Sequence, residues 1–203
     1  MRAILLTSTF RRHVFVANTV AAGCELAGVW QEEKTFRPER YAHDAADEAV
    51  IQRHFRAREE SEALHFADDS SLRLGSHAVH REVAAGACND PAEVSLMAAA
   101  RPDVVLVFGT GILRDPLLSA FDGRILNIHL GLSPYYRGAG TNFWPLVNRE
   151  PEYAGATIHY LDAGIDTGPI LSHARPQIER GDRPHDIGNR TIVAAAQALL
   201  RAA

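Results

Sequence analysis

The sequence contains few cysteines, a single lysine and no long apolar run. Cys24 and Cys88 are its two cysteines, and neither belongs to a Cys-x-x-Cys motif or a metal-spaced cluster, which excludes a disulfide framework. Lys34 is the lysine, and the formal net charge of −4 argues against a general nucleic-acid-binding surface. No apolar stretch approaches the roughly 20 residues that span a bilayer, and Met1–Thr7 lacks a signal-peptide pattern. We therefore expect a cytoplasmic location, without membrane or nucleic-acid partners.

The chain does contain enough apolar material for one hydrophobic core. Its 203 residues are 46% hydrophobic and 23% charged, which is typical of a globular protein of about one domain. The ten histidines do not indicate a metal site, because pairs such as His77 and His80 lack the spacing and third ligand of a zinc centre. We expect no bound metal.

Apolar periodicity predicts alternating strands and helices, and hence an α/β protein. Ala3–Thr7 and Ala27–Gln31 resemble buried strands, and His13–Leu26 between them has helical spacing. Such a βαβ unit implies a mostly parallel sheet with helices on both faces. The clearest buried parallel strand is Asp103–Phe108. Further strands are predicted at 78–83, 155–160 and 168–174, and further helices at 45–66, 91–100 and 184–201.

Two of these helices carry local signals of their own. Asp90, Pro91 and Glu93 match a helix start with a capping box, in which Glu93 would bond the backbone of the cap residue. In the helix at 45–66, Arg58 and Glu62 are four apart and can support an exposed face. We expect that helix to be mostly solvated.

The most informative segment contains an amide, an imidazole and a carboxylate. Asn127 and His129 lie two apart at the end of an apolar strand, so their side chains share one face. A carboxamide and a protonated imidazole can both donate hydrogen bonds to a developing oxyanion. A nearby carboxylate, such as that of Asp166, can keep the imidazole charged or help to remove a proton. These groups suit acyl transfer to a nucleophile that the substrate brings.

The ordered combination of Asn127-x-His129, a Pro-Tyr-Tyr-Arg-Gly loop at 134–138 and Asp166-Thr-Gly-Pro resembles the folate-dependent formyltransferase family. That family includes the glycinamide ribonucleotide, methionyl-tRNA and nucleotide-sugar formyltransferases. The resemblance implies that Asn127, His129 and Asp166 are catalytic, with His159 nearby. It also implies a Rossmann-like, three-layer αβα formyltransferase fold. The chain would then be a single catalytic domain, 1–203, with a variable segment at about 31–87.

The family resemblance also implies which residues hold the folate. The loop after the strand at 103–108 corresponds to the family segment that contacts the pterin ring, so Gly111, Ile112 and Leu113 are candidates to bind 10-formyltetrahydrofolate. Asp162 is a further candidate, although it can equally well stabilise the Asp166 loop.

Residues for the second substrate are predicted from two cationic segments. The glycine-containing loop 131–141 carries Tyr136 and Arg137, which can contact an acidic or ring-bearing substrate or order the loop itself. Arg11 and Arg12 can bind a phosphate. The segment 30–66 is where acceptor specificity would be encoded, with Phe36, Arg37, Arg40, Tyr41 and His54 as its candidates.

The acceptor itself is the open question. The segment Thr7–Arg12 contains no glycine, unlike the phosphate loop of glycinamide ribonucleotide formyltransferases, and the chain has no basic C-terminal extension for tRNA. We therefore expect N-formyl transfer to a primary amine of a small molecule, first a nucleotide-linked amino sugar or specialised metabolite. Glycinamide ribonucleotide formyltransferase, 10-formyltetrahydrofolate hydrolase and a non-catalytic folate-binding protein are the alternatives. The apolar stretch Ile192–Leu200 can serve either the core or a homodimer surface.

Overall fold

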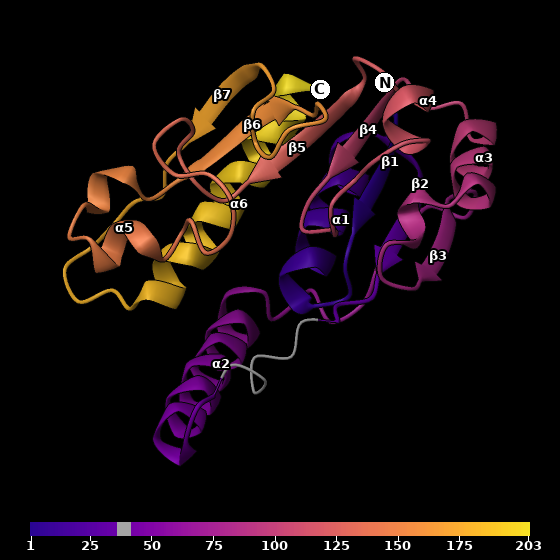
Figure 1. Cartoon of the computed structure of the whole chain (residues 1–203). Coiled ribbons are helices and arrows are strands. Elements are labelled where there is room, and N and C mark those ends of the chain that lie inside the picture. The colour runs from indigo at the N-terminus through magenta and orange to yellow at the C-terminus, as the bar shows by residue number, and fades with distance from the viewer. Residues whose placement is uncertain (36–41) are drawn as a thin grey trace.

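The computed structural model describes residues 1–35 and 42–203, which form three layers with a central sheet between two sets of helices (Figure 1). The sheet of the described residues has seven strands in the order β3-β2-β1-β4-β5-β6-β7. Its strands are β1 Arg2–Thr7, β2 Glu25–Glu32, β3 Val79–Val83, β4 Val104–Val107, β5 Ile125–His129, β6 Ala156–Tyr160 and β7 Ile170–Ala174. The predicted α/β class and three-layer arrangement are confirmed.

Helices cover both faces of this sheet. The α-helices are α1 Arg11–Gly23, α2 Ala45–His65, α3 Pro91–Ala99, α4 Leu117–Ala120, α5 Trp144–Val147 and α6 Pro184–Ala202, and the short 3-10 helices are η2 Ala87–Asn89 and η3 Pro151–Tyr153. One core lies between the sheet and α1 with α6, and the other lies between the sheet and α3 with α4. No helix in the described part of the chain is long and apolar enough to cross a membrane.

Strand direction reverses twice at one end of the sheet. Strands β1 to β5 pair in parallel, whereas β6 is antiparallel to β5 and β7 is antiparallel to β6. Strand β1 shows why the apolar runs are continuous, since Leu5 belongs to one core and Ile4 and Leu6 belong to the other. A strand covered on both faces needs apolar side chains at successive positions.

Two local predictions are wrong. The first helix ends at Gly23 instead of Leu26, because the chain from Glu25 onward pairs with β1 as strand β2. The capping box at α3 does not form, since Glu93 accepts hydrogen bonds from Trp30 Nε1 at 2.8 Å and from Arg81 Nε at 2.8 Å. Asp90 still precedes α3, without a side-chain cap bond. A pairing with distant side chains thus replaces the local cap.

Helix α2 projects beyond the three layers (Figure 1) and contacts α1 and α6. It is polar around most of its circumference, as the sequence predicts, and Leu64 is 74% exposed. The predicted exposed pair of Arg58 and Glu62 is an exception, because Glu62 is 5% exposed and its carboxylate also meets Arg12 of α1 at 2.6 Å. This buried carboxylate joins α2 to the main body.

Helix α6 packs its apolar face against the sheet. Ile192, Ala195 and Leu199 are buried there, so the stretch at 192–200 serves the core. Core packing is one of the two uses that the sequence left open for this stretch.

Candidate functional site

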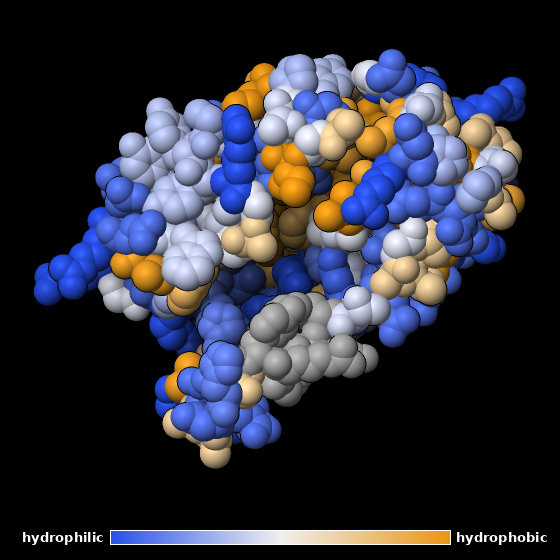
Figure 2. Space-filling view, in the orientation of Figure 1, coloured by the Kyte–Doolittle hydropathy of each residue, from blue (hydrophilic) through white to orange (hydrophobic). Residues whose placement is uncertain are grey.

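A large cavity lies at the carboxyl ends of the central parallel strands. It has a volume of about 750 Å³ and is lined by the segments that follow β1, β4 and β5, together with parts of α2 and α6. Figure 2 shows a hollow in this face, with hydrophobic side chains on one side of it and hydrophilic ones on the other. In open parallel sheets, ligands bind at the carboxyl ends of the strands where the strand order reverses. Here the order reverses between β1 and β4.

Asn127 reaches this cavity from β5 and lies directly opposite His159 of antiparallel β6. Its Nδ2 atom is 3.1 Å from His159 Nε2, and His159 Nδ1 is 2.8 Å from the carbonyl oxygen of Tyr160. Because a carbonyl can only accept, Nδ1 of His159 donates, and Nε2 of the neutral ring accepts from the Asn127 amide. His159 therefore fixes which way the Asn127 carboxamide points.

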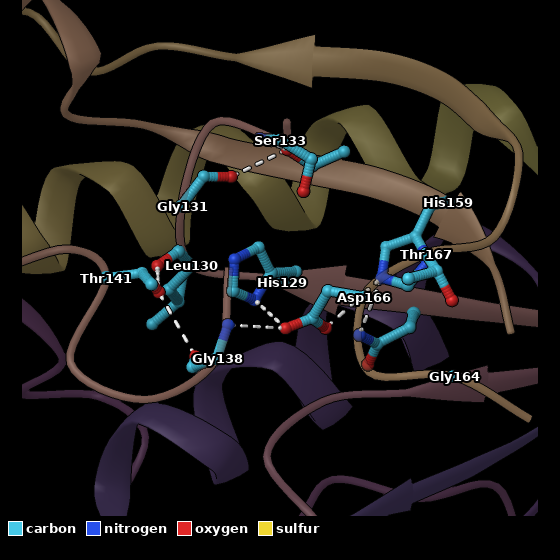
Figure 3. Close-up of polar contacts among 12 residues, drawn as sticks. His129, Leu130, Gly131, Ser133, Gly138, Thr141, His159, Gly164, Asp166 and Thr167 are labelled. Carbon is cyan, nitrogen blue, oxygen red and sulfur yellow. Dashed lines mark hydrogen bonds and ion pairs between the residues drawn. The ribbon is translucent and has the colours of Figure 1, made fainter. Parts of the chain in front are cut away.

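His129 follows on the same face of β5 and lies beside the carboxylate of Asp166 (Figure 3). Its Nε2 atom is 2.8 Å from the Tyr136 carbonyl oxygen, and its Nδ1 atom is 3.2 Å from Oδ2 of Asp166. An imidazolium, which has a proton on each nitrogen, satisfies both partners. The predicted association of Asn127, His129 and Asp166 is thus present in space.

Asp166 lies on the loop between β6 and β7 in a left-handed backbone conformation, with φ of 51°. The backbone N–H of Gly138 donates to its Oδ2 at 2.9 Å, and His159 Nε2 lies 3.6 Å from its Oδ1. Burial raises the pKa of Asp166, but its contacts with His159, the Gly138 N–H and His129 outweigh burial and hold the pKa below its usual value. The carboxyl group is therefore ionised at neutral pH.

The predicted folate loop is held by two side chains of opposite charge at the end of β2. Glu32 Oε1 accepts from the backbone N–H of Gly111 at 3.0 Å, and Lys34 Nζ donates to the Thr110 carbonyl oxygen at 3.3 Å. These two backbone groups belong to one peptide unit, so a carboxylate and an ammonium clamp it from both ends. Gly111, Ile112 and Leu113 all line the cavity. Neither Glu32 nor Lys34 was a predicted site residue, since no local pattern links β2 to this loop.

Asp162 lines the cavity and also stabilises the loop that carries Asp166. Its Oδ1 accepts from the backbone N–H of Gly164 at 3.0 Å and from the Thr167 hydroxyl at 2.7 Å. These bonds form an Asx-type turn, which agrees with the structural role predicted for Asp162 as the alternative to folate binding.

Of the four predicted contacts to the second substrate, Arg12 lines the cavity. The Tyr136 hydroxyl instead bonds Glu150 and Asn148, and Arg137 is exposed outside the cavity lining. Arg11 donates to the carbonyl oxygen of Phe66 at 3.2 Å, beyond the end of α2. Tyr136 still matters through its carbonyl group, because that group accepts from His129.

Further cavity residues lacked any motif in the sequence. His13 of α1 is 2% exposed, and burial followed by repulsion from Arg12 lowers its pKa well below the usual value. Its Nδ1 atom has no hydrogen-bond partner among the described residues. Arg58 and Glu62 of α2 also line the cavity, as does the predicted His54. The other specificity candidates, Phe36, Arg37, Arg40 and Tyr41, lie outside the described residues.

Comparison with known proteins places these features in one family. A family model described as "Formyl transferase" matches residues 33–203. The chain is 37% identical over 90 residues to a phosphoribosylglycinamide formyltransferase of Escherichia coli, covering 44% of this chain and 42% of that protein. It is 39% identical over 104 residues to a methionyl-tRNA formyltransferase of Roseiflexus, covering 51% of this chain and 30% of that protein. These matches thus span less than half the length of either relative.

The fold is similar to that of solved structures over its whole length. A phosphoribosylglycinamide formyltransferase from Streptococcus pneumoniae superposes with a TM-score of 0.65 at 21% identity, covering 100% of this chain and 97% of that one. The family model covers most of the chain, including Asn127, His129 and Asp166. The chain therefore belongs to the formyl transferase family.

Proposed function

We propose that this protein transfers the formyl group of 10-formyltetrahydrofolate to a primary amine of a small molecule. The observation that carries the proposal is the grouping of Asn127, His129 and Asp166 at one cavity, with His129 Nδ1 3.2 Å from the Asp166 carboxylate. An amide donor, an imidazolium and an ionised carboxylate are the groups that such a reaction requires, and none of them needs to be the nucleophile.

In the proposed reaction the neutral amine attacks the formyl carbon, a new C–N bond forms, and the bond to the folate nitrogen breaks. Asn127 has two amide hydrogens, one of which donates to His159. The second can donate to the oxyanion that develops on the formyl oxygen. Asp166 assists removal of the proton from the attacking amine, directly or through water, and that proton replaces the formyl group on the folate nitrogen.

The geometry refines the role of His129. Both of its ring nitrogens face protein acceptors, the Tyr136 carbonyl and Asp166. In this conformation the imidazolium stabilises negative charge by its proximity, and direct donation to the oxyanion would require the Tyr136 carbonyl to move. Loop 131–141 therefore controls how His129 acts.

The size and the apolar surface of the cavity support the proposal that it binds the folate headgroup. A volume of about 750 Å³ lies within the range of small-molecule sites. Ile112 and Ile165 both line it, yet they are 59% and 62% exposed, which leaves apolar surface for a pterin ring to cover. Glu32 and Lys34 hold the loop that presents Ile112.

For the acceptor, we propose a nucleotide-linked amino sugar or a specialised-metabolite amine, with glycinamide ribonucleotide as the second candidate. The second candidate is supported by the names of the relatives. Against it, Thr7–Arg12 contains no glycine, and the backbone N–H of Arg12 is already directed at Glu62 Oε2 at 3.4 Å. A carboxylate of the protein thus occupies the start of α1, where a substrate phosphate would otherwise bind.

The test is turnover of 10-formyltetrahydrofolate by the purified protein, followed by absorbance, against a panel of primary amines. The panel includes a nucleotide-linked amino sugar and glycinamide ribonucleotide, and the controls are a reaction without amine and the His129→Ala variant. We expect turnover that depends on one class of amine and is lost in His129→Ala.

Two results would contradict the proposal. Equal turnover with and without amine would show a hydrolase, and His129→Ala turning over at the wild-type rate would remove the catalytic assignment. Folate binding without turnover of any amine in a broad panel would favour a binding protein.

A further inference from the structure

The part of the cavity wall that comes from α1, α2 and the end of β2 has an excess of positive charge. Among the described lining residues before position 70, Arg12, Lys34 and Arg58 are cations and Glu62 is the one carboxylate. This contrasts with the formal net charge of −4 for the whole chain. A concave wall of one sign concentrates ligands of the opposite sign.

Arg12 and Arg58 form the centre of this excess. Their guanidinium carbons lie 4.8 Å and 5.6 Å from the centre of the Phe10 ring, so both groups contact one aromatic side chain. Both also face the same oxygen of Glu62, with Arg12 Nη1 at 2.6 Å and Arg58 Nε at 3.6 Å. Among the described residues, Glu62 is the one carboxylate in an ion pair with these two guanidinium groups, and the charge of Glu59 also acts on Arg58.

Arg58 retains unused donor capacity. Its Nε atom is buried and has no hydrogen-bond partner among the described residues. Burial and then the repulsion of Arg12 lower the pKa of Arg58. A partly buried guanidinium with an unsatisfied donor, next to a second guanidinium, is stabilised when an anion binds to both.

Two neighbouring histidines add hydrogen-bonding groups to this part of the cavity wall. His54 and His185 form an edge-on ring pair with centroids 4.7 Å apart, and both line the cavity. Burial and then Arg58 lower the pKa of His54, while burial and then His54 and Arg58 lower the pKa of His185. Both rings are therefore neutral near pH 7 and can donate or accept a hydrogen bond without adding charge.

We propose that Arg12 and Arg58 bind an oxyanion group, a phosphate or a carboxylate, on the acceptor amine. This inference rests on the proposed formyl transfer, because the anion and the reacting amine would belong to one molecule within the same cavity as Asn127 and Asp166. Guanidinium groups match both oxyanions through paired N–H donors. The proposed site consists of side chains and not of backbone N–H groups, because Glu62 already faces the backbone N–H of Arg12 at the start of α1.

The first experiment measures binding without any chemistry. Inorganic phosphate and acetate are titrated separately by calorimetry at fixed ionic strength into the wild type, Arg58→Gln, Arg58→Lys and Arg56→Gln. Arg56 is the matched control because it lies on the same helix and is exposed. We expect saturable binding of at least one anion, about tenfold weaker in Arg58→Gln, intermediate in Arg58→Lys and unchanged in Arg56→Gln.

Circular dichroism shows whether each variant keeps helix α2. If Arg58→Gln unfolds, Arg58→Lys, which retains the charge beside Glu62, tests whether anion binding depends on the guanidinium group. Absence of saturable binding of either anion to the wild type would overturn the proposal. So would equal affinity in the wild type and both Arg58 variants. The preferred anion distinguishes a phosphate-bearing acceptor from a carboxylate-bearing one.

The second experiment compares turnover of paired amines, glucosamine 6-phosphate against glucosamine and glycine against glycinamide. We expect kcat/KM to favour the anionic member of a pair about tenfold or more in the wild type but not in Arg58→Gln. Equal kcat/KM within both pairs would overturn the oxyanion site while formyl transfer stands. Anion binding that depends on Arg58, without turnover of any amine, would instead reject formyl transfer and leave the oxyanion site in place.

Discussion

The carboxylate of Asp166 and the imidazole of His129 meet across 3.2 Å, although they lie on different segments, the β6–β7 loop and the end of β5. The Gly138 N–H donates to the same oxygen of Asp166, at 2.9 Å. The loop 131–141 thus contributes twice, because the Tyr136 carbonyl in it also accepts from His129. Two loops and one strand end define the charged centre of the site.

Replacing Asp166 by Asn should reduce kcat by roughly 10²- to 10⁴-fold, because the amide keeps the shape but removes the charge and the proton acceptor. Folate affinity, measured by fluorescence quenching, should change little. Asp122→Asn, at an exposed position, is the matched control. A kcat for Asp166→Asn within a factor of about three of wild type would exclude Asp166 from proton transfer.

The same variant should reveal a pH-dependent contribution to stability. The folded-state pKa of Asp166 is lowered, so its ionised form stabilises the fold above the pKa of an unfolded aspartate, about 3.9, and this contribution disappears as the pH falls through the lower, folded-state value. The free energy of unfolding of wild type minus that of Asp166→Asn, from urea titrations between pH 7 and pH 2, should therefore decrease toward low pH. A difference that increases on acidification would show that folding raises the pKa of Asp166 instead of lowering it.

Asn127→Ala should lower kcat by roughly 10²- to 10³-fold, the range for loss of one oxyanion donor. KM for the folate should change much less, since the amide acts mainly in the transition state. Gln177→Ala removes an exposed carboxamide outside the cavity lining and serves as the control. If both variants lose activity equally, the effect is not specific to the position at β5.

Glu32→Gln should weaken folate binding by roughly tenfold, because a neutral amide oxygen holds the Gly111 N–H less strongly than a carboxylate does. At saturating folate, kcat should stay near the wild-type value, since Glu32 positions a loop and does not contact the reacting atoms. Glu33→Gln changes the adjacent, exposed carboxylate and should leave affinity unchanged. Unaltered folate affinity in Glu32→Gln would show that the contact between Glu32 and the Gly111 N–H does not contribute to folate binding.

Much of the fold and the centre of the site could be predicted because they depend on local periodicity. Strand alternation places Asn127 and His129 on one face of β5, and the continuous apolar run of β4 marks a strand covered on both sides. The position of Asp166 beside them depends on the fold, and the family resemblance supplied it.

The rest depends on pairings between distant segments, for which sequence periodicity carries no signal. Glu93 matches a capping box, yet it bonds Trp30 and Arg81 instead. Glu62 resembles a member of an exposed helical pair, yet it is buried against Arg12. In each case the carboxylate pairs with a cation from another element of the fold.

The antiparallel pairing of β5 and β6 has a consequence for how this family member can change in evolution. Asn127 faces His159 across the ladder, and Ile128 faces Ile158. Since side chains alternate between the two faces, inserting or deleting one residue in β6 would send His159 into the core and Ile158 into the cavity. The packing of Ile158 in the core and the position of His159 opposite Asn127 both depend on the register of β6. This strand can therefore accept substitutions far more readily than any change in its length.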